Sequence, residues 1–512
     1  MFLTLLLLWS LLSLLYFFFT TIQKHQTRLT KPLLNSTYGP SSYPIIGCFI
    51  SFYKNEHNLL DWYASLLSGS PSQTIVVHRI GARRTVVTGN PFNVEHILKT
   101  NFANFPKRKP LTEFLGDLLG CGIFNVDGDL WSTQRKLASH EFSIKSLREF
   151  VVNTLAEEVE HRLIPLLEEA AESQKVLDMQ EILRRFAFDT VSKVSLGSDP
   201  FCLDLTRPVP PLVKAFECAA EISARRSTAS LYLMWKIKRA LSIGSEKKLK
   251  EAVKVVHGSV HEIIQNKKKV FERDGERSES HDMLSRLLLA GHSEEVVRDM
   301  VISFILAGRD TTSAAMTWLF WLLSKHPDIT HKIVNEVENV VVRTKKWYGK
   351  LGFDDLQKMR FLRACLCESM RLYPPVPWDS KHAEVDTVLP DGTWVGKGDR
   401  VTYFPYGMGR MEELWGNDRF EFNPDRWFDI ESGCAGDKVL KSVSPYKFPV
   451  FQAGPRVCLG KEMAFIQMMY VMASVLRRFE IRPVCGEDQP AFVPLLTAHM
   501  AGGLKVLVRK RN

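Results

Sequence analysis

The sequence FQAGPRVCLG, residues 451–460, decides the fold class of this 512-residue chain, and it directly precedes a long, largely apolar helical pattern. Cys458 falls at the predicted helix N-terminus, where free amides and the positive end of the helix dipole favour a thiolate. Arg456 adds a cation two residues away. Gly454 and Gly460 are expected to let the backbone approach a flat ligand closely. A lone cysteine is most often a small buried hydrophobe, but this setting is what a thiolate metal ligand requires.

The loop resembles the cysteine loop of the haem-thiolate monooxygenases, the cytochromes P-450. That family's spaced pattern is matched here by Phe451, Gly454, Arg456, Cys458 and Gly460. The resemblance implies a haem b cofactor, with Cys458 as the axial iron ligand, Arg456 on a haem propionate and the other three residues against the haem. A proximal thiolate pushes electron density onto the iron and favours O–O cleavage, which suits insertion of oxygen into a C–H bond.

A second motif, AGRDTT at residues 307–312, lies within the apolar helical pattern of residues 294–326. We expect Gly308 to remove a side chain where this helix passes a flat ligand. An acid in so apolar a segment is costly to bury unless it is paired, so Asp310 is expected to have a specific role. Thr311 can hydrogen-bond to a carbonyl in the preceding turn. By the same resemblance, Asp310 and Thr311 are the acid–alcohol pair that delivers protons to dioxygen; the alternative for Asp310 is an ordinary salt-bridged helix residue.

Two further groups suit the carboxylates of a haem. Trp131 and Arg135 are four residues apart, on one helical face, and an indole N–H and a guanidinium both donate to carboxylates. The family places this pair on a haem propionate; the alternative is a surface arginine beside a core tryptophan. Lys381 or His382 aligns with another propionate position, and both remain candidates.

Glu368 and Arg371 are three residues apart on a predicted helix, where opposite charges can meet. The family joins this pair to an arginine in a later proline-rich loop, and Arg426 supplies it here. We predict that these three residues form a structural charge network with no catalytic role. Asp425 and Trp427 stand where family members often have Glu and Phe.

The N-terminus is predicted to anchor the chain in a membrane. Residues 1–23 carry no charged side chain, and about 20 apolar residues suffice to span a bilayer as a helix. Lys24, Arg28 and Lys31 follow, so the positive-inside rule leaves the rest of the chain in the cytosol. A cleaved signal peptide, the alternative, would have a basic start and a shorter apolar stretch. With the family resemblance, this implies a single-pass protein of the endoplasmic reticulum membrane.

Behind the anchor we expect a basic, proline- and glycine-rich linker over residues 24–47 and a single haem-binding monooxygenase domain over residues 48–512. Periodic helical patterns dominate this domain. Turn signals between β-branched runs predict a hairpin at residues 73–91 and a second β region at residues 386–404. The predicted fold is mainly α with small β-sheets, the cytochrome P-450 fold, preceded by an N-terminal transmembrane helix.

Composition excludes several other classes. Charged residues at 24% and aromatic residues at 11% are ordinary for a folded protein. Nine scattered cysteines, an odd number, do not form a disulfide scaffold. The net charge of +10 suits an anionic membrane surface or an acidic protein partner. The basic run at residues 267–269 is followed by acids, which favours a solvated helix end over a nucleic-acid site.

The resemblance also implies the source of electrons: NADPH supplies them through a separate acidic flavoprotein, an NADPH-cytochrome reductase. The sequence contains no dinucleotide-binding fingerprint, which agrees with a separate reductase. O₂ is the second substrate, and it yields one inserted oxygen atom and one water.

Narrower resemblances concern the organic substrate. Stretches such as LGCGIFNVDGDLW (residues 119–131) and FILAGRDTTSAAMTW (residues 304–318) look like the plant fatty-acid ω-hydroxylase clan. Others, such as PYGMGRM (residues 405–411) and FVPLLTAHMAGG (residues 492–503), look like its jasmonoyl-isoleucine 12-hydroxylase subgroup. Both substrates are amphipathic carboxylates with an apolar tail.

Terminal hydroxylation requires a narrow apolar channel and an anchor for the acid end, because internal C–H bonds are weaker than those of the methyl group. Apolar candidates at the family's recognition regions, each of which is otherwise plain core, are Phe114, Phe124, Phe304, Val376 and Leu496. The basic loop of Lys107, Arg108 and Lys109 either meets the carboxylate or is simply solvated.

These features predict a membrane-anchored ω-hydroxylase of jasmonoyl-isoleucine that turns over a plant hormone conjugate. A general fatty-acid ω-hydroxylase is the alternative with the same chemistry. A haem protein that binds or isomerises a ligand without activating oxygen is a third hypothesis, but it has no need of an acid–alcohol pair. A non-enzymatic anchored adaptor would leave the cysteine loop unexplained.

Overall fold

The computed structural model describes Ser13 and residues 38–109, 111–229, 233–274, 282–343, 350–429, 439–484 and 489–511. The predicted membrane anchor, apart from Ser13, and most of the predicted linker lie outside these residues. No helix within the described ranges is both long enough and apolar enough to cross a bilayer.

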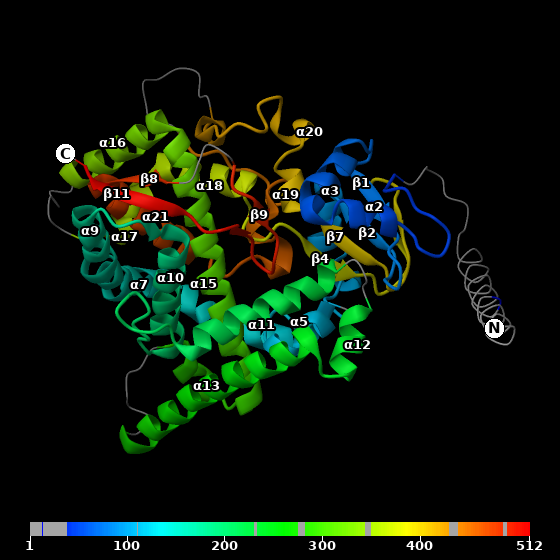
Figure 1. The fold of residues 1–512 in the computed structure, drawn as a ribbon, viewed down its shortest axis with the longest axis horizontal. Helices are drawn as coiled ribbons and strands as arrows, with labels where there is room; N and C mark the ends of the chain where they lie inside the picture. The colour runs from blue at the N-terminus through cyan, green and yellow to red at the C-terminus, as the bar shows by residue number, and fades with distance from the viewer. Residues whose placement is uncertain are drawn as a thin grey trace, which may run out of the picture.

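Helices dominate the described part of the chain (Figure 1). The helices of the first half are α2 (Phe49–Lys54), α3 (Leu59–Ser68), α4 (Pro91–Glu95), α5 (Leu111–Leu119), α6 (Gly128–Ser139), α7 (Ile144–Phe150), α8 (Ala156–Glu158), α9 (Ile164–Ser173), α10 (Met179–Leu196), α11 (Pro211–Thr228), α12 (Met234–Ala240) and α13 (Gly244–Asp274). Those of the second half are α14 (Met283–Leu289), α15 (Glu294–Lys325), α16 (Pro327–Arg343), α17 (Phe353–Lys358), α18 (Arg360–Leu372), α19 (Pro405–Met408), α20 (Glu412–Trp415) and α21 (Lys461–Arg478).

The strands form small, separate sheets. They are β1 (Thr74–Val77), β2 (Thr85–Thr88), β3 (Leu177–Asp178), β4 (Asp379–His382), β5 (Thr387–Val388), β6 (Trp394–Val395), β7 (Arg400–Tyr403), β8 (Phe479–Pro483), β9 (Phe492–Val493), β10 (His499–Met500) and β11 (Lys505–Lys510). One sheet has the order β1-β2-β7-β4, another β3-β11-β8, and β5-β6 and β9-β10 are isolated pairs. The mainly α fold with small sheets is therefore confirmed.

Both predicted β regions are present, but one pairing joins them. In the first region β1 and β2 are antiparallel, with Thr74 opposite Thr88. In the second, β5 pairs with β6, whereas β7 runs parallel to β2 and brings Val401 opposite Val86. A single sheet thus joins residues 74–88 to residues 379–403 beside α2 and α3 (Figure 1). The β3-β11-β8 sheet was not predicted, although burial alternates along the first four of the six residues of β11; its edge strand β3 has only two residues and shows no period.

Helix α15 runs through the middle of the molecule (Figure 1). It begins where the Ser293 hydroxyl accepts from the Val296 N–H at 3.4 Å, with Glu294 and Glu295 in its first turn. A serine cap and early acids both stabilise a helix N-terminus. It ends before Pro327, since the residue preceding a proline disfavours the helical conformation. Its largely buried surface explains why its sequence is apolar on most sides.

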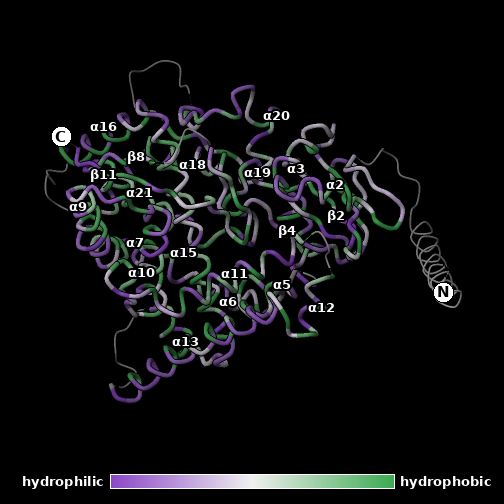
Figure 2. The backbone as a smooth tube through the Cα atoms, viewed as in Figure 1, coloured by the Kyte–Doolittle hydropathy of each residue, from purple (hydrophilic) through white to green (hydrophobic). Residues whose placement is uncertain are grey.

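The basic run at residues 267–269 lies near the C-terminal end of α13, and the projecting end of that helix is hydrophilic in Figure 2. Lys267 pairs with Asp282 at 2.6 Å, and Lys268 pairs with Glu294 at 2.8 Å. Acids of the following helices thus neutralise two of these lysines, in agreement with the prediction against a nucleic-acid site.

Glu368 and Arg371 are fully buried on α18, and the structure brings Arg426 to them. Glu368 accepts from Arg371 Nε and from Arg426 Nε, both at 2.8 Å. Trp427 donates its indole N–H to Glu368 at 2.9 Å, so the tryptophan found where the family often has phenylalanine closes the network. Arg371 also donates to the carbonyl oxygens of the segment after α20, including Glu421 at 3.0 Å. One buried carboxylate therefore fixes α18 against the chain that leads to the cysteine loop.

We expect Glu368→Ala to lower the free energy of unfolding by about 3–5 kcal/mol, because the buried Arg371 loses its counter-charge and Arg426 keeps only Asp418. Urea unfolding followed by tryptophan fluorescence measures this loss. Glu413→Ala, at an exposed position of α20, is the matched control. A Glu368→Ala protein as stable as the control would contradict the structural role of the network.

Candidate active site

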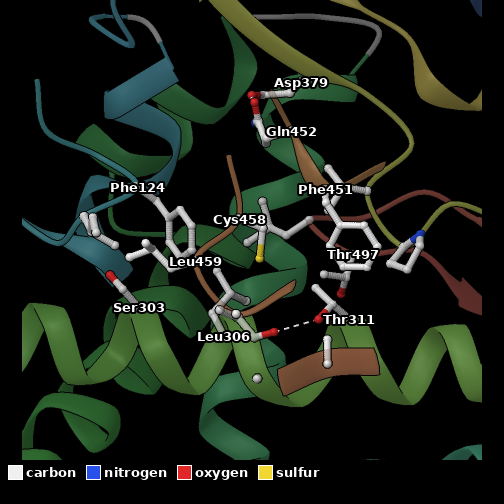
Figure 3. A pocket seen from close by; sticks show the side chains of 18 of the residues that line it. Phe124, Ser303, Leu306, Thr311, Asp379, Phe451, Gln452, Cys458, Leu459 and Thr497 are labelled. Carbon is white, nitrogen blue, oxygen red and sulfur yellow. Dashed lines mark hydrogen bonds between the residues drawn. The ribbon is translucent and has the colours of Figure 1, made fainter. Parts of the chain in front are cut away.

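An internal cavity of about 430 Å³ lies between the cysteine loop and α15. The loop contains two short 3₁₀ turns, η8 (Pro449–Phe451) and η9 (Gly454–Arg456), followed by Cys458. Figure 3 shows the Cys458 sulfur pointing into the cavity on the side of α15. The other lining side chains come mainly from α5, α6, α10, α11, α21 and the segment before β10.

The Cys458 thiol is positioned by its own loop. Its backbone N–H donates to the Phe451 carbonyl oxygen at 2.8 Å, which closes the loop. Burial raises the pKa of the thiol. The groups that lower this pKa are the Gly460 N–H and the charges of Arg135 and Lys461. Coordination to a metal ion deprotonates a thiol outright, and the Cys458 side chain is accessible from the cavity, so it is free to serve as a ligand.

Two of the glycines make room for neighbouring protein segments, whereas Gly460 lines the cavity. A Cβ on Gly454, whose φ is +63°, would lie 2.0 Å from the Leu98 carbonyl oxygen. A Cβ on Gly308 would lie 2.6 Å from the Val191 side chain of α10. Both glycines therefore allow close packing of protein segments, of the cysteine loop on η2 (His96–Thr100) and of α15 on α10.

Arginines and a tryptophan line one edge of the cavity. The Arg456 guanidinium stacks over the Trp131 ring at 4.5 Å and pairs with Asp127 at 2.7 Å. Arg456 therefore faces Asp127, and the cations that lower the pKa of the Cys458 thiol are Arg135 and Lys461. Arg135 donates to the Val457 carbonyl oxygen at 2.6 Å. Trp131, Arg135 and Arg456 all line the cavity, so the structure brings these predicted propionate partners together.

Lys381 and His382 lie on β4, behind this edge rather than in the lining. Lys381 is 1% exposed, and its ammonium has no hydrogen-bond partner among the described residues. Burial and the neighbouring Lys107 charge hold the pKa of Lys381 well below its usual range, although Asp379 opposes them. Burial lowers the pKa of His382 to about 4, and its Nδ1 contacts the Lys107 carbonyl oxygen at 3.0 Å. His382 is thus neutral near pH 7, and Lys381 is the better partner for an anion.

These residues fit an iron porphyrin with two carboxylates. Cys458 offers a soft sulfur ligand, and Arg135, Arg456 and Trp131 offer donors at one edge. The buried Lys381 ammonium lies 3.6 Å from Asp379, which also binds Lys107, and it makes no hydrogen bond among the described residues. An entering carboxylate would supply that hydrogen bond.

Thr311 lines the cavity and Asp310 does not. The Thr311 hydroxyl donates to the Ala307 carbonyl oxygen at 2.7 Å (Figure 3). Asp310 accepts from the buried Arg309 at 3.1 Å, and Arg309 also pairs with Glu217 of α11. Burial raises the pKa of Asp310, and the Arg309 charge offsets part of that effect. A carboxyl with a raised pKa beside a cavity hydroxyl suits proton transfer.

The apolar candidates for substrate contact all line the cavity; they are Phe114, Phe124, Phe304, Val376 and Leu496. Phe304 also stacks on Phe142, with centroids 6.4 Å apart, and Phe114 packs on Trp235. Two of the five are therefore shared between the cavity wall and the core.

The basic loop does not present three cations to the cavity. Arg108 pairs with Glu384 at 2.7 Å, and the Lys109 side chain is 79% exposed. Neither residue lines the cavity. Lys107 does, but its ammonium is paired with Asp379 at 2.7 Å. The loop as a carboxylate anchor is thus excluded for Arg108 and Lys109.

Sequence reasoning missed several polar groups of the lining. Asp379 carries a signal, since it lies two residues before the candidate Lys381. Glu141 and the α11 hydroxyls of Ser223 and Ser227 carry none, because helical periodicity does not reveal which helix faces a cavity.

The fold and the site together define a haem-thiolate monooxygenase. The cytochrome P450 family profile matches residues 38–501. The chain is 62% identical to cytochrome P450 94B1 of Arabidopsis thaliana over 494 residues, 96% of each chain. It is 62% identical to cytochrome P450 94B3 of the same plant, over 93% of each chain. Identity to cytochrome P450 94A1 of Vicia sativa is 45%, over 92% of this chain and 91% of the relative.

The chain belongs to the cytochrome P450 family. It is a monooxygenase with a haem-thiolate cofactor, and as a member of this family it uses O₂ and electrons from a reductase.

We expect Thr311→Ala to retain haem while the product formed per NADPH falls by about 10²-fold, the usual contribution of a positioned proton donor. The missing reducing equivalents should appear as hydrogen peroxide, measured beside product and NADPH. Thr317→Ala, which loses a similar hydrogen bond to Ser313 outside the cavity, is the control. Unchanged product per NADPH in Thr311→Ala would refute the role.

A buried acid on η4 (His140–Phe142) makes stability depend on pH. Glu141 lines the cavity, lies 3.2 Å from Arg286, and has its pKa raised to about 7 by burial. The native state thus binds this proton more tightly than the unfolded state does. Its stabilising contribution is complete below the usual pKa near 4.5 and is lost as the pH rises through about 7.

We expect Glu141→Gln to reduce the loss of stability between pH 5.5 and pH 8, since an amide does not titrate. The urea midpoint at the two pH values measures it. Glu149→Gln, a half-exposed acid of α7, should leave the dependence unchanged. Equal pH dependence in wild type and Glu141→Gln would contradict the assignment.

Proposed function

We propose that this enzyme hydroxylates the terminal carbon of the pentenyl chain of jasmonoyl-L-isoleucine to give 12-hydroxy-jasmonoyl-isoleucine, and so contributes to turnover of the jasmonate hormone. The observation that carries the proposal is the apolar cavity between the Cys458 sulfur and Thr311. Sequence stretches that resemble the jasmonoyl-isoleucine 12-hydroxylases narrow the substrate. The chain is 62% identical to the 94B1 and 94B3 relatives and 45% identical to 94A1, so we group it with the first two.

The cavity wall favours terminal attack. Bulky apolar side chains, among them Phe124, Phe304 and Leu496, narrow the space around the cysteine loop. A slender apolar chain fits such a space with its end foremost, because burying it there removes apolar surface from water. The acid end of the substrate then stays away from the Cys458 sulfur.

Hydroxyls of α11 favour the conjugate over a free fatty acid. Ser223 lines the cavity, is fully buried, and its hydroxyl has no hydrogen-bond partner among the described residues. A buried polar group without a partner is costly. The conjugate has an amide and a ketone between its ends, whereas a fatty acid has no polar group there.

The haem, when bound, supplies the iron at which O₂ is activated. Cys458 would bind the iron through its sulfur. Thr311 presents a hydroxyl to the cavity, and the adjacent Asp310, whose pKa is raised, is the proton source. Arg135, Arg456 and Lys381 would neutralise the haem carboxylates, and Trp131 would donate its indole N–H to one of them.

We further propose the organisation of the whole chain. Residues 1–23 form a single transmembrane anchor in the endoplasmic reticulum, residues 24–47 form a basic linker, and residues 48–512 form one catalytic domain in the cytosol. The uncharged first 23 residues and the positive charges after them support this arrangement. The partner that delivers electrons from NADPH is a membrane-bound NADPH-cytochrome reductase.

A competition assay tests the substrate. With a plant reductase and NADPH, equal jasmonoyl-isoleucine and lauric acid compete in one tube, and products are read by mass spectrometry. We expect the conjugate to be preferred, with one oxygen at the chain terminus. Preference for lauric acid would move the function to general fatty-acid ω-hydroxylation, and product from neither would refute both substrates.

The same assay with Ser223→Ala tests the role of the hydroxyl. We expect kcat/KM for the conjugate to fall by about 2- to 10-fold, as for one lost hydrogen bond, and that for lauric acid to stay unchanged. Ser192→Ala, a similarly buried and unpartnered serine of α10 that does not line the cavity, is the control. Equal effects on both substrates would overturn the role of Ser223.

A further inference from the structure

A buried carboxylate, Asp379, joins separate segments of the chain above the cysteine loop. It is the first residue of β4 and lines the cavity. Its oxygens accept from the Lys107 ammonium at 2.7 Å, the Tyr403 hydroxyl at 3.0 Å and the Gln452 side-chain amide at 2.5 Å. Figure 3 shows Asp379 and Gln452 facing each other beyond Cys458. The carboxylate thus links β4, β7, the basic loop and the cysteine loop.

Asp379 is ionised in these surroundings. Burial opposes its charge, but the ammonium groups of Lys107 and Lys381 outweigh burial and hold the pKa of Asp379 well below its usual range. A charged acceptor makes stronger hydrogen bonds than a neutral one. The bond to the Gln452 amide is therefore among the stronger ones that hold the cysteine loop.

Gln452 needs such a bond because its backbone is in an unfavourable conformation. Its φ is +61° and its ψ is −176°, a region occupied almost only by glycine and costing of order 1–3 kcal/mol for other residues. Gln452 follows Phe451, whose carbonyl oxygen accepts the Cys458 N–H at 2.8 Å. The conformation at Gln452 thus helps to direct the carbonyl group that closes the loop around the sulfur.

We propose that Asp379 is a positioning residue for the cysteine loop: by binding the Gln452 amide it holds the backbone turn that places Phe451 against Cys458, and so maintains thiolate ligation of the haem iron. It acts on the Cys458 loop through the Gln452 amide, to which its carboxylate is bound. Lys107 serves the same purpose indirectly, since it neutralises the carboxylate without competing for the Gln452 amide.

The test uses the haem-loaded, full-length enzyme and reads thiolate ligation directly. The reduced carbonyl complex has a long-wavelength Soret band only while the thiolate binds iron, and its decay in mild urea is timed. We expect this decay to be about 10-fold faster in Asp379→Asn, as for loss of a charged hydrogen bond. Gln452→Leu, which leaves the Asp379–Lys107 pair intact, should give a similar acceleration and keeps the test open if Asp379→Asn fails to fold.

Two controls separate positioning from general stability. Asp391→Asn alters another bridging carboxylate, one that accepts from Thr74 and Asn93 away from the cavity, and should not change the decay. In a Gln452→Gly background the backbone strain and the amide are both absent, so adding Asp379→Asn should have no further effect. The proposal would be overturned if the Soret band of Asp379→Asn or Gln452→Leu decayed as slowly as that of Asp391→Asn. It would also be overturned if Asp379→Asn accelerated the decay equally in the Gln452→Gly background.

Discussion

The hydrogen bond from the Cys458 N–H to the Phe451 carbonyl oxygen closes the loop that presents a sulfur ligand to the cavity. The surroundings of the loop keep it in this form. Gly454 lies against the Leu98 carbonyl oxygen, where no side chain fits, and Gln452 is bound by a buried carboxylate. The loop is thus clamped by segments distant in sequence.

Buried charge is the second theme of the molecule. Around Glu368 the charges are satisfied entirely by protein groups, so the network serves the fold. Near the cavity two ammonium groups share one carboxylate: Lys107 and Lys381 lie 2.7 and 3.6 Å from Asp379, and the Lys381 ammonium makes no hydrogen bond among the described residues. A carboxylate that entered beside Lys381 would supply the second negative charge and the missing hydrogen bond.

Much of the site could be predicted from local sequence, because its motifs are short. The cysteine loop, the Asp310–Thr311 pair and the Trp131–Arg135 spacing each place their residues through one loop or one helical face. Local sequence did not reveal contacts between segments that are distant along the chain. Gly308 packs on Val191, Arg108 pairs with Glu384, and Arg456 pairs with Asp127 while it also lines the cavity. Helical periodicity marks a buried face but does not name the neighbour that buries it.

The sequence by itself determined that this is a mainly helical haem-thiolate monooxygenase, since a cysteine between spaced glycines and an acid–alcohol pair in an apolar helix are patterns of adjacent residues. Only the tertiary structure decided which charges meet. It paired Lys107 with Asp379, left Lys381 for an anion, and brought Ser223 of α11 to the cavity wall. The physical reason is that burial and electrostatic partners depend on distances between segments far apart along the chain.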